Sequence, residues 1–286
     1  MKKLLALLFA GIMIFGLAAC GGSSDAPAPA ETDAAAPAET GAEAPAETEA
    51  AGSDLDAIIG RGVLVVGITD FEPMDYTDEN GEWIGFDADM ARAFAEELGV
   101  DIEFVEIDWD NKILELNSGA VDCIWNGMTL TDEVMSAMEC TNAYMSNSQA
   151  IVASADAAAA ITSIEDCAEL SFAVEAGSAG EAAAEDAGLT YTPVQNQAAA
   201  LMEVQAGTSD AAIIDELMAI AMVGEGTSYA DLAQSINLTE EEYGVGFRQG
   251  SDAAAALNDF FAASYADGTM TQIAETYGLE NSIIPQ

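Results

Sequence analysis

The fold class is decided by the stretch VLVVGI at residues 63–68. It is apolar throughout and mostly β-branched, which is typical of a strand buried on both faces of a sheet. The stretch FDADMARAFAEEL at residues 86–98 carries large apolar side chains at every fourth position from Phe86 to Leu98, and Gly99 follows it. That spacing predicts an amphipathic helix ended by a glycine. A buried strand followed by a helix begins a βαβ unit, so we expect a mostly parallel sheet.

The alternation of strands and helices continues along the chain. We expect strands at 102–107 and 121–125, with a short helix at 111–117 between them. The same pattern begins again at residue 149 and predicts a second α/β unit. Its expected strands are 149–153, 171–174, 191–194 and 210–214, and its expected helices are 178–187, 196–205 and 216–223.

The end of the chain predicts how the two units are connected. A strand at 244–248 is followed by two helices at 252–265 and 269–277, which have little sheet of their own to cover. We therefore expect the chain to return to the first unit near Tyr243, so that two segments join the units as a hinge.

These patterns predict an α/β fold of two lobes, each a mostly parallel sheet flanked by helices. Ligands of open α/β sheets bind at the carboxyl ends of the strands, so we expect a ligand cleft between the lobes. The predicted extents are 54–150 plus 244–286 for lobe 1 and 151–243 for lobe 2.

Residues 1–20 have the pattern of a cleaved export signal. Lys2 and Lys3 precede a short apolar run, and small residues precede Cys20. The ending LAAC resembles the lipobox of bacterial lipoproteins, which implies that Cys20 is acylated. Residues 21–53 consist largely of Ala, Pro, Glu and Thr, so we expect a disordered linker. The sequence thus predicts an exported protein, anchored by lipid to the outer face of the cell membrane.

Charge and composition exclude several classes of function. The chain has 51 acids against six cations and a formal net charge of −45, which opposes binding to nucleic acid or to an anionic membrane surface. It has no histidine, which rules out a histidine-based catalytic triad. Cys123, Cys140 and Cys167 form no Cys-x-x-Cys motif, so we expect buried free thiols, with one disulfide as the alternative, and no structural metal site. We also expect no cofactor.

Several polar stretches fall where the predicted strands end, and together they resemble a known family. In order along residues 55–286, they match the family 3 solute-binding proteins of amino-acid ABC transporters. The resemblance implies a type II periplasmic-binding-protein fold, a monomer that closes on a small amino acid and presents it to a membrane permease. The matching stretches are GITD at 67–70 with Pro73, GFDADMA at 85–91, DWD at 108–110, GMTLT at 127–131, AGS at 176–178, 210–215 and 243–248.

The same resemblance assigns ligand contacts in lobe 1. Phe71 is implied to lie against the ligand and Trp109 to form a second wall. Gly127 and Thr129 are implied to donate hydrogen bonds from a strand end, with Met128 between them in the site. The alternative for Phe71 and Trp109 is that they are ordinary core aromatics.

Two ligand contacts are implied in lobe 2. Ser178 is implied to donate to the ligand at a helix start, where free N–H groups favour a carboxylate. Asp215 is implied to bind the ligand ammonium. For both residues the alternative is a helix N-cap.

The chain departs from the family at one position. Members usually carry an arginine for the ligand carboxylate where this chain has Val134. One explanation is that Lys112 replaces the arginine, since Asn111-Lys112-Ile113 resembles the Asn-Arg-Ile of the acidic-amino-acid branch. The other is that the ligand is an amine or polyamine without a carboxylate, bound through charge and cation–π contacts.

Two rival functions remain. Dehydratases of prephenate or arogenate type resemble these binding proteins, and Glu72 and Asp75 are the candidate general acids for such chemistry. A ligand-sensing lipoprotein is the other rival. We expect a binding protein rather than an enzyme, because the predicted lipid tether favours a receptor.

Overall fold

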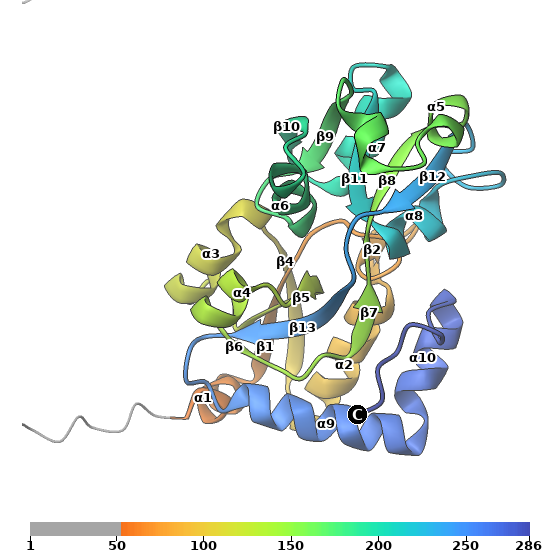
Figure 1. Cartoon of the computed structure of the whole chain (residues 1–286). Coiled ribbons are helices and arrows are strands. Elements are labelled where there is room, and N and C mark those ends of the chain that lie inside the picture. Colours follow the sequence, from red (N-terminus) through yellow and green to blue (C-terminus); the bar gives the residue numbers. More distant parts are fainter. Residues whose placement is uncertain (1–52) are drawn as a thin grey trace, which may run out of the picture. The chain divides into compact units, whose positions relative to one another are not determined.

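The computed structural model describes residues 53–286, which form two lobes (Figure 1). The predicted export signal, Cys20 and the linker up to residue 52 lie outside the described residues. Across residues 53–286, none of the helices combines the length and the apolar character needed to cross a bilayer. Cys123, Cys140 and Cys167 are free thiols, and only Cys140 is partly exposed.

Lobe 1 is built on a mixed sheet in which three neighbouring strands are parallel, a fourth runs antiparallel to them, and two short strands pair antiparallel with that fourth strand. Its strands in spatial order are β4 (Asp101–Glu106), β1 (Val63–Ile68), β5 (Cys123–Thr129), β13 (Glu241–Phe247) and β6 (Glu139–Cys140), with β7 (Met145–Asn147) also paired to β13. A separate hairpin is formed by β2 (Tyr76–Thr77) and β3 (Trp83–Ile84).

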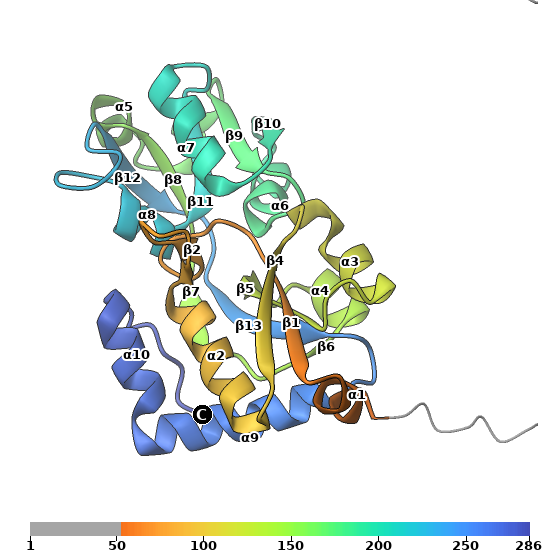
Figure 2. The ribbon, with the colours of Figure 1, turned by 180° about the vertical axis from the view of Figure 1, so that it is seen from behind.

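Helices cover both faces of this sheet, and the alternation of side chains along β1 explains why. Leu64, Val66 and Ile68 face one core and Val65 faces the other. Figures 1 and 2 show α2 and α10 on one side and α3 and α4 on the other. The helical elements of lobe 1 are α1 (Asp54–Arg61), α2 (Phe86–Leu98), η1 (Trp109–Asn111), α3 (Lys112–Ser118), α4 (Asp132–Ala137), α9 (Ala253–Asp267) and α10 (Thr269–Tyr277).

Lobe 2 has a second mixed sheet. Its strands in spatial order are β10 (Thr190–Val194), β9 (Ser171–Glu175), β11 (Ala211–Asp215), β8 (Gln149–Ser154) and β12 (Leu232–Asn237). The first three strands are parallel, and β8 runs antiparallel to both β11 and β12. Its helical elements are α5 (Ala155–Ala160), η2 (Ile164–Cys167), α6 (Ala179–Asp186), α7 (Gln197–Ala206) and α8 (Glu216–Met222).

The chain passes between the sheets twice. It leaves the lobe 1 sheet after β7 and enters the lobe 2 sheet at β8, with Ser148 between them. It returns between β12 and β13. The predicted strand at 121–125 is longer than expected at its carboxyl end, because β13 pairs with β5 as far as Thr129 and covers its polar residues. Strand β12 was not predicted.

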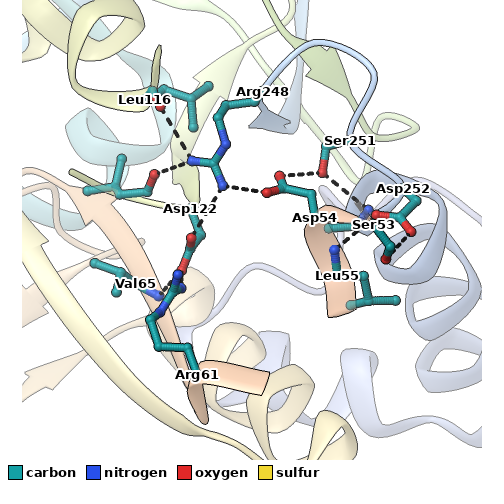
Figure 3. Close-up of polar contacts among 12 residues, drawn as sticks. Ser53, Asp54, Leu55, Arg61, Val65, Leu116, Asp122, Arg248, Ser251 and Asp252 are labelled. Carbon is teal, nitrogen blue, oxygen red and sulfur yellow. Dashed lines mark hydrogen bonds and ion pairs between the residues drawn. The ribbon is translucent and has the colours of Figure 1, made fainter. Parts of the chain in front are cut away.

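Arg248, directly after β13, ties three distant segments of lobe 1 together (Figure 3). Its guanidinium donates to Asp54 at the start of α1 (2.8 Å), to the carbonyl of Val121 (2.7 Å) and to Asp122 (3.4 Å). The buried Asp122 also pairs with Arg61. The returning segment of the chain is therefore fixed to the first helix and to the beginning of β5.

Candidate functional site

One cavity of about 250 Å³ lies between the two lobes, at the carboxyl ends of β1, β5, β9 and β11. The volume equals roughly that of eight waters at ~30 Å³ each, which suits a small molecule. All of the sequence-predicted ligand contacts line this cavity. These residues are Phe71, Trp109, Lys112, Gly127, Met128, Thr129, Ser178 and Asp215.

The aromatic residues are walls of the cavity and members of the lobe 1 cores at the same time. Phe71 packs edge-on against Tyr243 with ring centres 6.4 Å apart, and Trp109 belongs to the cluster that holds α3 and α4. Both rings are more than nine-tenths buried. The two interpretations of these residues are therefore compatible, because each residue belongs to a core cluster and also lines the cavity.

Lys112 joins the lobes at one side of the cavity. Its Nζ donates to the carbonyl of Gly177 in lobe 2 at 2.7 Å and to the carbonyl of Trp109 at 3.3 Å, and it lies 5.0 Å from the centre of the Trp109 ring. An ammonium has three protons, so one donor remains. Burial lowers the pKa of Lys112, and nearby acids, Glu133 first, oppose that shift.

Asp215 lies in the cavity wall within a shell of neutral donors. Its Oδ1 accepts from Asn147, from Gln149 (2.9 Å) and from the hydroxyl of Tyr243 (2.9 Å). Among residues 53–286, its Oδ2 accepts only from Gln197 and keeps one acceptor position. The side chain makes no capping bond to α8, so it does not act as an N-cap. Burial, then the charge of Glu241, raise the pKa of Asp215 well above its ordinary value.

The expected donors at the end of β5 are already engaged. The N–H of Gly127 donates to the buried Asp87 at 2.6 Å, and the hydroxyl of Thr129 donates to Glu241 at 2.9 Å. In this conformation, neither the N–H of Gly127 nor the hydroxyl of Thr129 is free to donate a hydrogen bond to a ligand. Gly127 instead makes room for the aromatic wall, because a Cβ there would lie 2.4 Å from Cε1 of Phe71 and the backbone φ is +52°.

Ser178 is the N-cap of α6. Its Oγ accepts from the N–H of Glu181 at 3.1 Å, so the hydroxyl oxygen is used by the helix while its proton remains free. Ser178 therefore acts as a helix N-cap, and it also lines the cavity.

The cavity wall also contains residues that the sequence reasoning missed. Glu175 ends β9 and Gln197 begins α7, and both are buried in the wall. Burial, then the charge of Asp215, raise the pKa of Glu175 to about 8, while Gln197 and Lys112 oppose the shift. Glu175 directly precedes the AGS stretch at 176–178, which matches the family pattern. Its position at the end of a predicted strand could therefore have indicated that it lines the cavity. Val134, where the family arginine is missing, also lines the cavity.

Comparisons with known proteins agree with this architecture. The sequence profile of the family described as "Bacterial extracellular solute-binding proteins, family 3" matches residues 64–280. The arginine-binding extracellular protein ArtP of Bacillus subtilis is 29% identical over 224 residues, which cover 77% of this chain and 75% of that protein.

Solved structures share the fold. The ancestral amino acid-binding protein AncCDT-1, a precursor of cyclohexadienyl dehydratase, superposes with a TM-score of 0.72 and 33% identity, covering 79% of this chain and 99% of that one. A substrate-binding protein of an ABC uptake transporter from Streptococcus pneumoniae, solved with histidine, gives a TM-score of 0.71 at 27% identity, covering 79% and 96% of the two chains. With a family match that spans most of its length, this chain belongs to the family 3 bacterial extracellular solute-binding proteins.

Proposed function

We propose that this protein captures an amino acid in the cavity between its lobes and delivers it to an ABC importer. The observation that carries the proposal is a cavity between the lobes with a buried acid on the lobe 2 side and a lysine on the lobe 1 side. Opposite charges at two sides of a small cavity match the two ends of an amino acid.

The ligand ammonium is assigned to Asp215. The free acceptor position on its Oδ2 and the donor shell that orients its carboxylate support this assignment. The ligand carboxylate is assigned to the remaining donor of Lys112. Lysine offers a point charge rather than the planar fork of an arginine, so this end is held less rigidly than an arginine would hold it.

A carboxylate-free amine is the second candidate ligand. Val134 leaves no arginine in the cavity wall, which contains four acids, Asp132, Glu133, Glu175 and Asp215, against one lysine. An excess of acid over cation favours a positively charged ligand.

We also propose that the ligand is bound without turnover. The sequence-predicted candidate acids do not support a dehydratase, because Asp75 is fully buried and does not line the cavity, and Glu72 lines a different one. Glu175, whose pKa is about 8, has the protonation that a general acid requires. The purified protein should therefore be incubated with prephenate and with arogenate. Formation of a dehydrated product would overturn this part of the proposal.

The remaining assignments concern place and partners. We propose that the mature chain is a monomer, lipid-anchored through Cys20 outside the cell membrane, and that its partner is the permease of the importer. Replacing Cys20 with alanine should move the protein from the membrane fraction to the soluble fraction. Retention of the variant in the membrane would contradict the anchor.

A thermal-shift screen of the standard amino acids and common polyamines tests the function. A ligand that binds only the folded state raises the unfolding temperature by mass action. We expect at least one amino acid to stabilise the wild type and the Asp101→Asn control, in which an exposed acid is removed, but not Asp215→Asn. Response to polyamines alone would favour the second candidate, and response to neither class would refute the proposal.

A further inference from the structure

Glu175 is a buried acid with one carboxyl oxygen that the described residues leave without a hydrogen-bond partner. Its side chain is 3% exposed, lines the cavity, and its Oε1 accepts no hydrogen bond from the residues that the structure describes. Leaving a buried carboxyl oxygen unpaired is costly, and such a group in a native site needs an explanation.

The nearby lysine does not supply that partner. Lys112 gives its two observed hydrogen bonds to the carbonyls of Gly177 and Trp109, and within residues 53–286 it forms no ion pair with Glu175. The ionisable groups that act on Glu175 are Asp215 on β11, Lys112 on α3 and Asp108 before η1. The cavity thus contains two buried acids and one buried cation.

Charge balance in the cavity helps to indicate the ligand class. A zwitterionic amino acid brings no net charge and leaves one acid uncompensated when both acids are ionised. An amino acid with a second cationic group brings one net positive charge and balances the three buried groups. A zwitterion therefore leaves Glu175 protonated and its Oε1 unpaired, whereas a second cationic group pairs with the ionised carboxylate. Because an unpaired buried carboxyl oxygen is costly, the second class is preferred.

We propose that Glu175 is a specificity-determining residue that recognises the second cationic group of a dibasic amino acid, an ammonium or a guanidinium. This inference rests on the proposed function, because it assumes that Asp215 binds the first ammonium. Glu175 and Asp215 end neighbouring parallel strands, so one small ligand reaches both carboxylates.

Matched ligands isolate the second charge. Arginine and citrulline are nearly isosteric and differ in the charge of the side chain, as do lysine and norleucine. We expect wild type to bind the cationic member of at least one pair 10-fold or more tightly than the neutral member in calorimetric titrations. Glu175→Gln should reduce this preference to less than about 3-fold while keeping the binding of the neutral member.

Asp108→Asn is the control variant. It removes a nearby exposed acid that does not line the cavity, so it should retain the wild-type preference. An equal loss of preference in both variants would indicate a general effect of negative charge and would overturn the assignment to Glu175. Unchanged preference in Glu175→Gln would overturn it as well.

Proton release provides a second readout. Glu175 is largely protonated at pH 7 in the empty cavity, so binding of a second cation should expel that proton. Titrations in phosphate and Tris buffers should show more proton release with the cationic ligand than with its neutral partner, and the difference should vanish in Glu175→Gln. Binding of neutral amino acids alone would overturn this inference but leave the proposed function intact, whereas binding of no amino acid or amine would refute both.

Discussion

The Nζ of Lys112 lies 2.7 Å from the carbonyl oxygen of Gly177, and this hydrogen bond joins lobe 1 to lobe 2 at the edge of the cavity. One side chain therefore contributes both to the cavity wall and to the contact between the lobes. Its role at the ligand and its role in closure have to be separated by experiment.

Lys112→Met should weaken binding of a ligand that has a carboxylate more than binding of one that lacks it. Losing a hydrogen bond to a charged group costs about 1.5–3 kcal/mol, or roughly 10- to 150-fold in affinity. Lysine and cadaverine differ only in the carboxylate, as do arginine and agmatine. Calorimetry should show the loss for the amino acid only, and an equal loss for both members of a pair would mean that Lys112 acts on closure alone.

Gly177→Ala should hinder closure of the lobes without unfolding either of them. A Cβ at Gly177 would lie 2.8 Å from Cα of Asp110 in lobe 1, and the backbone φ is +70°. Gly188→Ala is the matched control, since its φ is +67° and nothing lies within 4 Å of the added atom. We expect a similar small loss of thermal stability in both variants, but a loss of ligand affinity only in Gly177→Ala. Equal affinities would show that closure does not depend on this contact.

Asp87 should make stability fall as the pH rises. Burial raises the pKa of Asp87 from 3.8 to about 7, so between about pH 4 and pH 7 the folded protein holds a proton that the unfolded chain has lost. The protonated Asp87 contributes fully to stability below about pH 4, and this contribution is lost progressively as the pH rises to about 7. Urea unfolding should give a pH slope of the unfolding free energy that is shallower in Asp87→Asn by up to about 1.4 kcal/mol per pH unit. The exposed control Glu97→Gln should keep the wild-type slope, and an unchanged slope in Asp87→Asn would refute the prediction.

Arg248→Met should destabilise lobe 1 without affecting the ligand. The change removes the partner of Asp54 and a hydrogen bond to the buried Asp122, which we expect to cost about 3 kcal/mol. Arg92→Met, which breaks a more exposed pair with Asp89, should cost about 1 kcal/mol. Urea unfolding measures both values, and calorimetry should show unchanged ligand affinity. A cost for Arg248→Met no larger than for Arg92→Met would contradict the anchoring role.

Much of the fold was predictable, because periodicity reports burial. Residues 63–68 and 86–98 were predicted with the bounds that β1 and α2 have, since both are long and strongly patterned. Strand β12 was missed because its sequence, LAQSIN, lies at the edge of the sheet and lacks a continuous apolar run. The extension of β5 to Thr129 depends on pairing with β13, which is more than a hundred residues away.

The candidate site was predicted through its order along the chain, whereas its hydrogen bonds were not. The resemblance brought together residues that do line one cavity, from Phe71 to Asp215. It gave no indication that Asp87 accepts from the N–H of Gly127, because that contact joins α2 to β5 across 40 residues of sequence, at a glycine with positive φ. Glu175 was overlooked because an acid after a strand is common in a chain with 51 acids, and only its burial distinguishes it.

The central claim is that the cavity between the lobes holds an amino acid with its ammonium at Asp215. A crystal structure of the protein grown with the amino acid that stabilises it most tests this claim directly. We predict one ligand in the cavity, with its ammonium within about 3.2 Å of Oδ2 of Asp215 and its carboxylate beside Lys112. An empty cavity under saturating ligand, or a ligand bound with its carboxylate toward Asp215, would contradict the account.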